Sequence, residues 1–101
     1  MAVTKVIRYT TRPECAEENA RLVGAVYAEL AEQRPEGLQY ATLRLDDGVS
    51  FVHIAVLDGE ANPLSTSPAF SAFQAEIGDR LASGPEQSDA TVVGNYRLLP
   101  G

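Results

Sequence analysis

The 101-residue sequence predicts an α+β fold in which strands and helices follow one another in the order β-α-β-β-α-β. Three observations carry this prediction. Two stretches repeat apolar residues at helical spacing, four stretches are rich in β-branched and aromatic residues, and Asp47-Gly48 separates the two middle strand-like stretches. The length suits one domain over residues 1–101 with a single modest core.

Residues 3–9 are the first expected strand, because β-branched and aromatic side chains dominate V-T-K-V-I-R-Y. Its facing stays open, since Val3 and Ile7 share one parity and Val6 has the other. Pro13 suits the first turn of a helix, which we expect to end at residues 34–37, the sequence R-P-E-G. The apolar stripe between them consists of Ala16, Ala20, Val23, Val26, Tyr27 and Leu30.

Residues 38–46 and 49–58 are expected to form a hairpin, because Asp-Gly favours a two-residue turn. The register that follows pairs Arg44 with Phe51, Thr42 with His53 and Tyr40 with Ala55. Alternation then sorts the side chains into two faces. The wholly apolar face, which we expect to lie against the helices, carries Ala41, Leu43, Val52, Ile54 and Val56. The mixed face, which we expect to be open, carries Leu38, Tyr40, Thr42, Arg44, Phe51, His53, Ala55 and Leu57.

Ser67-Pro68 is expected to open the second helix, with serine as the N-cap and proline at the first position. Its apolar stripe consists of Phe70, Phe73, Ile77 and Leu81, and Ser83-Gly84-Pro85 ends it. Residues 90–99 are the last expected strand. In that strand Asn95 and Arg97 share a parity with Val93 and Leu99, and we expect them on the open face.

This order of elements is the ferredoxin-like arrangement, in which right-handed crossovers place both helices on one face of an antiparallel sheet. Two helices leave the other face uncovered. Since apolar residues lie on both faces, we expect the open face to mediate a homodimer, the commonest soluble oligomer.

Charge and composition argue against several classes of partner. Fourteen acidic and eight basic residues give a net charge of -6 without a basic patch, so neither nucleic acid nor an anionic membrane is an expected partner. Cys15 is the only cysteine, which leaves no intrachain disulfide and no thiol cluster for a metal. The first ten residues lack the apolar run of a secretory signal, so a cytoplasmic location is expected.

The chain resembles the dimeric α+β barrel superfamily, in particular the antibiotic biosynthesis monooxygenase-like domains. The resemblance rests on a first strand running into T-x-R-P-E, the long helix, the hairpin, and F-V-H-I-A-V-L-D-G-E-A-N-P-L-S-T-S-P-A-F-S-A-F-Q-A-E-I at residues 51–77. It implies a homodimer with a pocket between sheet and helices. Some relatives oxidise aromatic polyketide-type substrates with O2 and no cofactor, while others degrade haem. Leu64 and Ala69 stand where relatives often carry histidine, which argues against the haem-degrading role.

The only histidine, His53, is the candidate general base, and Tyr40, Thr42, Phe51, Asn95 and Arg97 are the candidate ligand-binding residues. No metal is expected, since Asp46-Asp47 serves the turn, and no cofactor is expected. With the resemblance, these residues predict a dimer that binds a hydrophobic or aromatic small molecule, and the resemblance implies that it acts as a cofactor-independent monooxygenase. A non-catalytic ligand-binding or stress-responsive dimer, and a structural module with a filled interior, stay open as alternatives.

Overall fold

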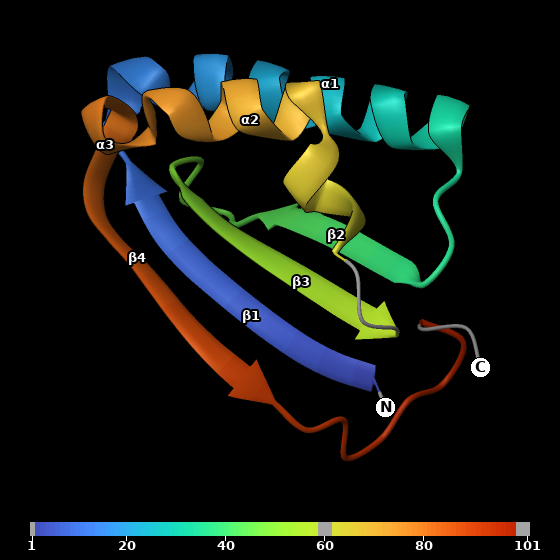
Figure 1. Ribbon diagram of the computed structural model, residues 1–101. Coiled ribbons are helices and arrows are strands. Elements are labelled where there is room, and N and C mark those ends of the chain that lie inside the picture. The colour runs from blue at the N-terminus through green and yellow to red at the C-terminus, as the bar shows by residue number, and fades with distance from the viewer. Residues whose placement is uncertain (1, 59–61, 99–101) are drawn as a thin grey trace.

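The computed structural model describes residues 2–58 and 62–98 and contains four antiparallel strands under a layer of helices (Figure 1). The strands are β1 (Ala2–Thr11), β2 (Leu38–Arg44), β3 (Ser50–Asp58) and β4 (Leu81–Ala90), and the sheet order is β2-β3-β1-β4. The helices are η1 (Pro13–Cys15), α1 (Ala16–Gln33), η2 (Pro63–Thr66), α2 (Pro68–Ala75) and α3 (Ile77–Arg80). The ferredoxin-like α+β prediction is therefore confirmed.

Local signals in the sequence set the ends of both long helical segments. Pro13 opens η1, which leads directly into α1, and α1 ends where Arg34 adopts a left-handed conformation with φ 47°. The hydroxyl of Ser67 accepts the Phe70 backbone N–H at 3.0 Å and caps α2, as its position before Pro68 predicts. Glu29 of α1 accepts hydrogen bonds from the Ser67 hydroxyl and the Ala69 backbone N–H, and so joins the two helices.

The hairpin has the predicted register and a longer turn than predicted. Arg44 pairs with Phe51, Thr42 with His53 and Tyr40 with Ala55. The connection is a loop over residues 46–49, in which the Gly48 N–H donates to the Leu45 carbonyl at 3.0 Å and Gly48 has φ 77°. The Asp47 carboxylate accepts the N–H groups of Val49 and Ser50, which explains why the four-residue loop is preferred to a two-residue turn.

The two faces of the sheet are the reverse of the prediction. Phe51 belongs to the buried core, and Tyr40 and Leu38 pack against it from below the helices. The smaller apolar residues Ala41, Leu43, Val52, Ile54 and Val56 lie on the other face, which no described element covers; there Leu43 is 50% exposed, whereas Val56 is buried outside the core cluster. Bulky aromatic side chains fill the deep space under the helices, and helix residues satisfy their polar atoms, so the mixed face is the buried one.

The last strand lies earlier in the chain than predicted. The predicted second helix breaks at Glu76, and Leu81 to Ala90 form β4 along β1, whereas residues 91–98 form no strand. The sequence A-S-G-P-E-Q-S-D has a low β propensity, and backbone pairing with β1 outweighs it. Residues 91–98 are exposed even where they are apolar, with Val93 101% and Leu98 78% exposed. Leu99, the predicted end, lies outside the described residues.

Gly37 makes the tightest backbone approach in the connection between α1 and β2. Its φ is 78°, and a Cβ atom there would lie 2.5 Å from the Asp58 carbonyl oxygen. We expect Gly37→Ala to lower the free energy of unfolding by about 2 kcal/mol, because both the left-handed backbone and the close contact oppose a side chain. Urea denaturation measures this change. Gly24→Ala is the matched control, since a Cβ at Gly24 in α1 meets nothing within 4 Å and the change should stabilise the helix. Equal midpoints for the two variants would contradict the prediction.

Candidate functional site

A buried cluster of polar side chains surrounds the imidazole of His53. Its Nε2 atom lies 2.7 Å from the Tyr9 hydroxyl, and its Nδ1 atom lies 2.6 Å from the Tyr40 hydroxyl and 3.2 Å from Thr42 Oγ1. His53 itself is 3% exposed. Both ring nitrogens are therefore engaged by hydroxyl groups, in a position that bulk water does not reach.

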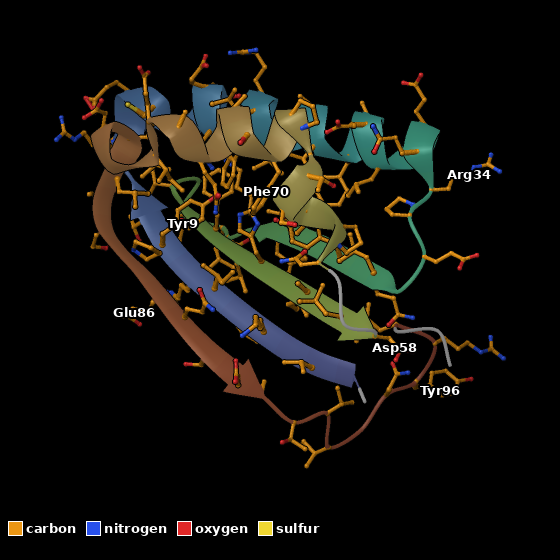
Figure 2. All side chains as sticks on the ribbon, viewed as in Figure 1. Tyr9, Arg34, Asp58, Phe70, Glu86 and Tyr96 are labelled. Atoms are coloured by element: carbon orange, nitrogen blue, oxygen red, sulfur yellow. The ribbon has the colours of Figure 1, made fainter. Side chains whose placement is uncertain are left out.

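The register of the sheet brings these groups together. His53 of β3 lies opposite Thr42 of β2 on one side and opposite Ile7 of β1 on the other. Tyr40 and Tyr9 are each two residues from those partners, so their side chains lie on the same face as the imidazole. Figure 2 shows Tyr9 pointing from the sheet toward the helix layer. The His53 cluster thus follows directly from strand pairing.

The helices complete the cluster from above. Asn19 of α1 is fully buried and donates from Nδ2 to the Tyr9 hydroxyl at 2.9 Å. Arg80 of α3 donates from Nε to Asn19 Oδ1 at 3.1 Å and from Nη2 to the Phe73 carbonyl at 2.5 Å, and its guanidinium lies over the Phe73 ring. Within residues 2–58 and 62–98, no buried side-chain nitrogen or oxygen lacks a hydrogen-bond partner.

Burial shifts the acid-base properties of these side chains. Desolvation lowers the pKa of His53 to about 4, so its imidazole is neutral at pH 7. Desolvation also raises the pKa of Tyr9 to about 12 and raises the pKa values of Tyr40 and Tyr27, so all three phenols keep their protons at pH 7. At neutral pH the cluster thus consists of neutral donors and acceptors next to the single cation of Arg80.

A pocket of about 350 Å³ opens next to this cluster, between the C-terminal half of α1 and the start of β2. Its walls are mainly apolar, and its phenols are those of Tyr27 and Tyr40, whose rings stack with centroids 5.2 Å apart. The Tyr27 hydroxyl lies 2.8 Å from Thr42 Oγ1. The pocket is lined by Tyr27, Leu30, Ala31, Arg34, Pro35, Leu38 and Tyr40. Tyr40 therefore lines the pocket and also contacts His53.

The structure brings together three of the six residues predicted for the site. His53, Tyr40 and Thr42 share one hydrogen-bonded cluster, although His53 does not line the pocket. Phe51 lies in the core, stacked on Tyr9 with centroids 5.6 Å apart. Asn95 and Arg97 lie in the segment after β4, off the sheet face where the prediction placed them, and Figure 2 shows neighbouring Tyr96 far from Tyr9.

Sequence reasoning missed Tyr9, Asn19, Tyr27 and Arg80 as members of the site. A signal for Asn19 was present, because positions 16, 19, 23, 26 and 30 also recur at helical spacing. A polar residue on such a stripe must find a buried partner. Arg80 carries the same signal three positions after Ile77 in the second stripe.

In the described part of the chain, no group of three or more His, Cys, Asp or Glu side chains is arranged to hold a metal ion. None of the helices there has the length and apolar character needed to cross a membrane.

Solved structures with the same fold place this geometry among known proteins. A putative antibiotic biosynthesis monooxygenase from Bacteroides thetaiotaomicron superposes with a TM-score of 0.77 at 19% identity, over 99% of this chain and 92% of that one. Rv0793 from Mycobacterium tuberculosis gives 0.70 at 16% identity, over 94% and 98%. This chain shares the fold of these two proteins. The predicted resemblance is thereby confirmed at the level of the fold.

A third structure of this fold is SnoaB from Streptomyces nogalater, described as a cofactor-independent oxygenase. It superposes with a TM-score of 0.68 at 24% identity, over 95% of this chain and 97% of that one. No family model and no curated protein matches the sequence.

Proposed function

We propose that the chain binds a planar aromatic molecule in the pocket beside Tyr40 and oxidises it with O2, without a cofactor. The observation that carries this proposal is the Tyr40 hydroxyl, which joins the mainly apolar pocket to the buried imidazole of His53. A pocket of about 350 Å³ lies within the usual size range for small-molecule sites. The fold shared with a cofactor-independent oxygenase supports the same class of reaction.

The chemistry requires a substrate that forms a stabilised carbanion or phenolate, such as an anthrone. Transfer of a proton from the ring methylene to water gives an enolate, and a phenol that donates a hydrogen bond to the enolate oxygen lowers the energy of that charge. The enolate carbon then transfers electrons to O2. Two C–H bonds and the O–O bond break, a C=O bond forms, and the second oxygen atom leaves as water with both protons. Tyr40 is the residue proposed to contact the substrate, and His53 acts through it.

Oxygen uptake with a panel of anthrones and quinols tests this proposal. We expect Tyr40→Phe to lower kcat about 100-fold, because it removes a donor that stabilises the developing oxyanion. His53→Ala should lower kcat as well, since it removes the group that positions the Tyr40 hydroxyl. Tyr96→Phe is the matched control, because Tyr96 is 81% exposed and lies outside the pocket. The oxygenase proposal is wrong if the wild type consumes no oxygen with any substrate of the panel.

The assembly proposed here is a homodimer formed through the open face of the sheet. That face carries Val6, Ala41 and Ile54 in one row across three strands, and Leu43 beside Val52 in the next. The segment after β4 adds further exposed apolar side chains, Val92, Val93, Tyr96 and Leu98, which a partner subunit could cover. An uncovered apolar sheet face of this kind is typical of a subunit interface.

A specific observation also favours a second function, binding without turnover. Both nitrogens of His53 are occupied by hydroxyl groups, and the pKa of about 4 leaves the ring a weak base. A ligand-binding dimer needs no base. Recovery of a bound anthrone unchanged after aerobic incubation would select this function over the oxygenase, whereas recovery of the oxidised product would exclude it.

A further inference from the structure

The hydrogen bonds around His53 have a direction, and Arg80 sets it. A guanidinium only donates, so the atom of Asn19 that faces Arg80 Nε at 3.1 Å must be the amide oxygen. The amide nitrogen of Asn19 therefore faces the Tyr9 hydroxyl at 2.9 Å and donates to it. The orientation of this amide follows from its partners.

The same reasoning assigns the proton of the imidazole. Tyr9 has one hydroxyl proton, and since the bond from Asn19 uses a lone pair, His53 Nε2 at 2.7 Å is the acceptor that remains. A Tyr9 proton aimed elsewhere would be buried without an acceptor, at a cost of about 1–3 kcal/mol. Tyr9 therefore donates to Nε2, and the neutral ring carries its proton on Nδ1. That proton faces the hydroxyl oxygens of Tyr40 and Thr42, which lie 2.6 Å and 3.2 Å from Nδ1.

Counting protons shows what this tautomer offers to the pocket. The hydroxyl groups of Tyr27, Tyr40 and Thr42 hold three protons, and the contact between Tyr27 and Thr42 uses one. A further bond between Thr42 and Tyr40, two residues apart on one face of β2, would use a second. When Thr42 donates one of these two bonds, the proton that is left belongs to Tyr27 or Tyr40, and both of these residues line the pocket.

We infer that the hydrogen-bond chain from Arg80 through Asn19, Tyr9 and His53 holds the pocket phenols as donors, so that the pocket selects aromatic ligands with an acceptor oxygen. A ketone or phenolate oxygen meets this requirement, and a ligand that only donates does not. The inference deepens the proposed function and rests on it, because it takes the Tyr40 pocket to be the ligand site. Asn19 and Arg80 are positioning residues in this chain.

A single isosteric change should reverse the direction of these hydrogen bonds. In Asn19→Asp, one carboxylate oxygen accepts from Arg80, whose charge keeps the carboxylate ionised, and the other accepts the Tyr9 proton. Tyr9 then accepts from His53 Nε2–H, and Nδ1 becomes the acceptor of the Tyr40 and Thr42 protons. With the Tyr27 proton given to Thr42, all three hydroxyl protons are used, and the phenols offer only lone pairs to the pocket.

Nitrogen-15 spectra of the imidazole test the inferred tautomer of His53 without any ligand. His53 is the only histidine, so its two ring nitrogens need no assignment by mutation. We expect the wild type to carry its proton on Nδ1 and Asn19→Asp to carry it on Nε2, while Asn19→Ala removes both bonds. A wild-type ring protonated on Nε2 overturns the inference even if Asn19→Asp does not fold.

Three tricyclic probes of similar shape test whether the pocket selects ligands with an acceptor oxygen. Fluorenone only accepts hydrogen bonds, carbazole only donates through its N–H, and fluorene does neither. We expect the wild type to bind fluorenone about tenfold more tightly than carbazole, and Asn19→Asp to reverse that order. The double variant Tyr27→Phe/Tyr40→Phe should bind fluorenone and fluorene equally. Fluorescence titration measures all these affinities.

The outcomes separate the inference from the proposed function. If the tricycles bind but the wild type does not prefer fluorenone, the selection by acceptor oxygen is wrong while the pocket remains a ligand site. If none of the three probes binds, the proposed ligand site and the selection both fail, and the nitrogen-15 spectra still decide the direction of the chain. A switch of tautomer in Asn19→Asp without a change in ligand preference also overturns the selection.

Discussion

Lowering the pH from 7 to 4 should reduce the free energy of unfolding by about 3 kcal/mol through His53 alone. The imidazole has a pKa of 6.5 in the unfolded chain and about 4 in the folded one, because burial disfavours its charged form. Between these values the unfolded chain binds a proton that the folded chain does not. Stability is therefore complete above pH 6.5 and falls as the pH falls toward 4. Each pH unit in this window contributes about 1.4 kcal/mol.

The groups around the ring explain why the folded state resists the proton. Its hydrogen-bonding partners Tyr9, Tyr40 and Thr42 are neutral, the ring of Phe73 lies 5.5 Å away, and the nearby charge of Arg80 is positive. No carboxylate among the described contacts of His53 is present to stabilise an imidazolium. A proton on Nε2 would also force Tyr9 to abandon its role as donor.

The comparison with His53→Gln isolates this effect from the titration of carboxylates. Glutamine keeps hydrogen-bonding atoms in the cluster and does not titrate. Urea denaturation at pH 7 and pH 4, at one protein concentration, should show the wild type losing about 3 kcal/mol more than the variant. If both proteins lose the same free energy, the buried neutral imidazole does not set the acid stability.

Much of the fold was predictable because its signals are local. The prolines at 13 and 68, the cap at Ser67 and the helical spacing of apolar residues each act within a few residues, and the structure places helices where they indicate. The hairpin register also follows from the adjacent strands. His53, Tyr40 and Thr42 could be grouped from that register alone.

The facing of the sheet and the last strand depend on distant contacts instead. Hydropathy alone favours burying Ala41, Leu43 and Ile54, but the volume of Tyr9, Phe51 and Tyr40 decides which face fills the space under the helices. β4 is held by backbone hydrogen bonds to β1, and the amino-acid composition of β4 does not predict that pairing. Asn19 and Arg80 join the site for the same reason, since only the packing of α1 against α3 and the sheet brings them to Tyr9.

The reversed facing strengthens the expectation of a dimer, because the uncovered surface is the more apolar one. The sequence predicts that a mixed face, with His53 and Arg44 on it, contacts the partner subunit. In the structure His53 is buried within the subunit, and on β2 and β3 the open face presents mainly β-branched and small apolar side chains. These apolar rows would bury well against a copy of the chain, while Arg8 and Glu86, which pair across β1 and β4 in the row of Val52, would need polar partners or water there.

Ile54→Lys should convert the proposed dimer to a monomer. Ile54 lies in the central row of the open face, between Ala41 of β2 and Val6 of β1, so a lysine there would have its charge buried at the centre of the interface. We expect the dissociation constant to rise at least about 100-fold, which corresponds to about 2.7 kcal/mol. In the isolated subunit the lysine would reach water, so the fold and its circular dichroism should persist.

Sedimentation velocity at micromolar concentration measures this change directly. Ala25→Lys is the matched control, because it adds the same single charge at an exposed position of α1, on the opposite side of the sheet, and it should leave the proposed dimer intact. A monomeric wild type would show that the open face meets water or another partner, and the dimer proposal would be wrong. A dimeric Ile54→Lys would place the interface elsewhere. The proposed ligand site beside Tyr40 is lined by residues of one subunit, so the monomeric variant should still bind fluorenone.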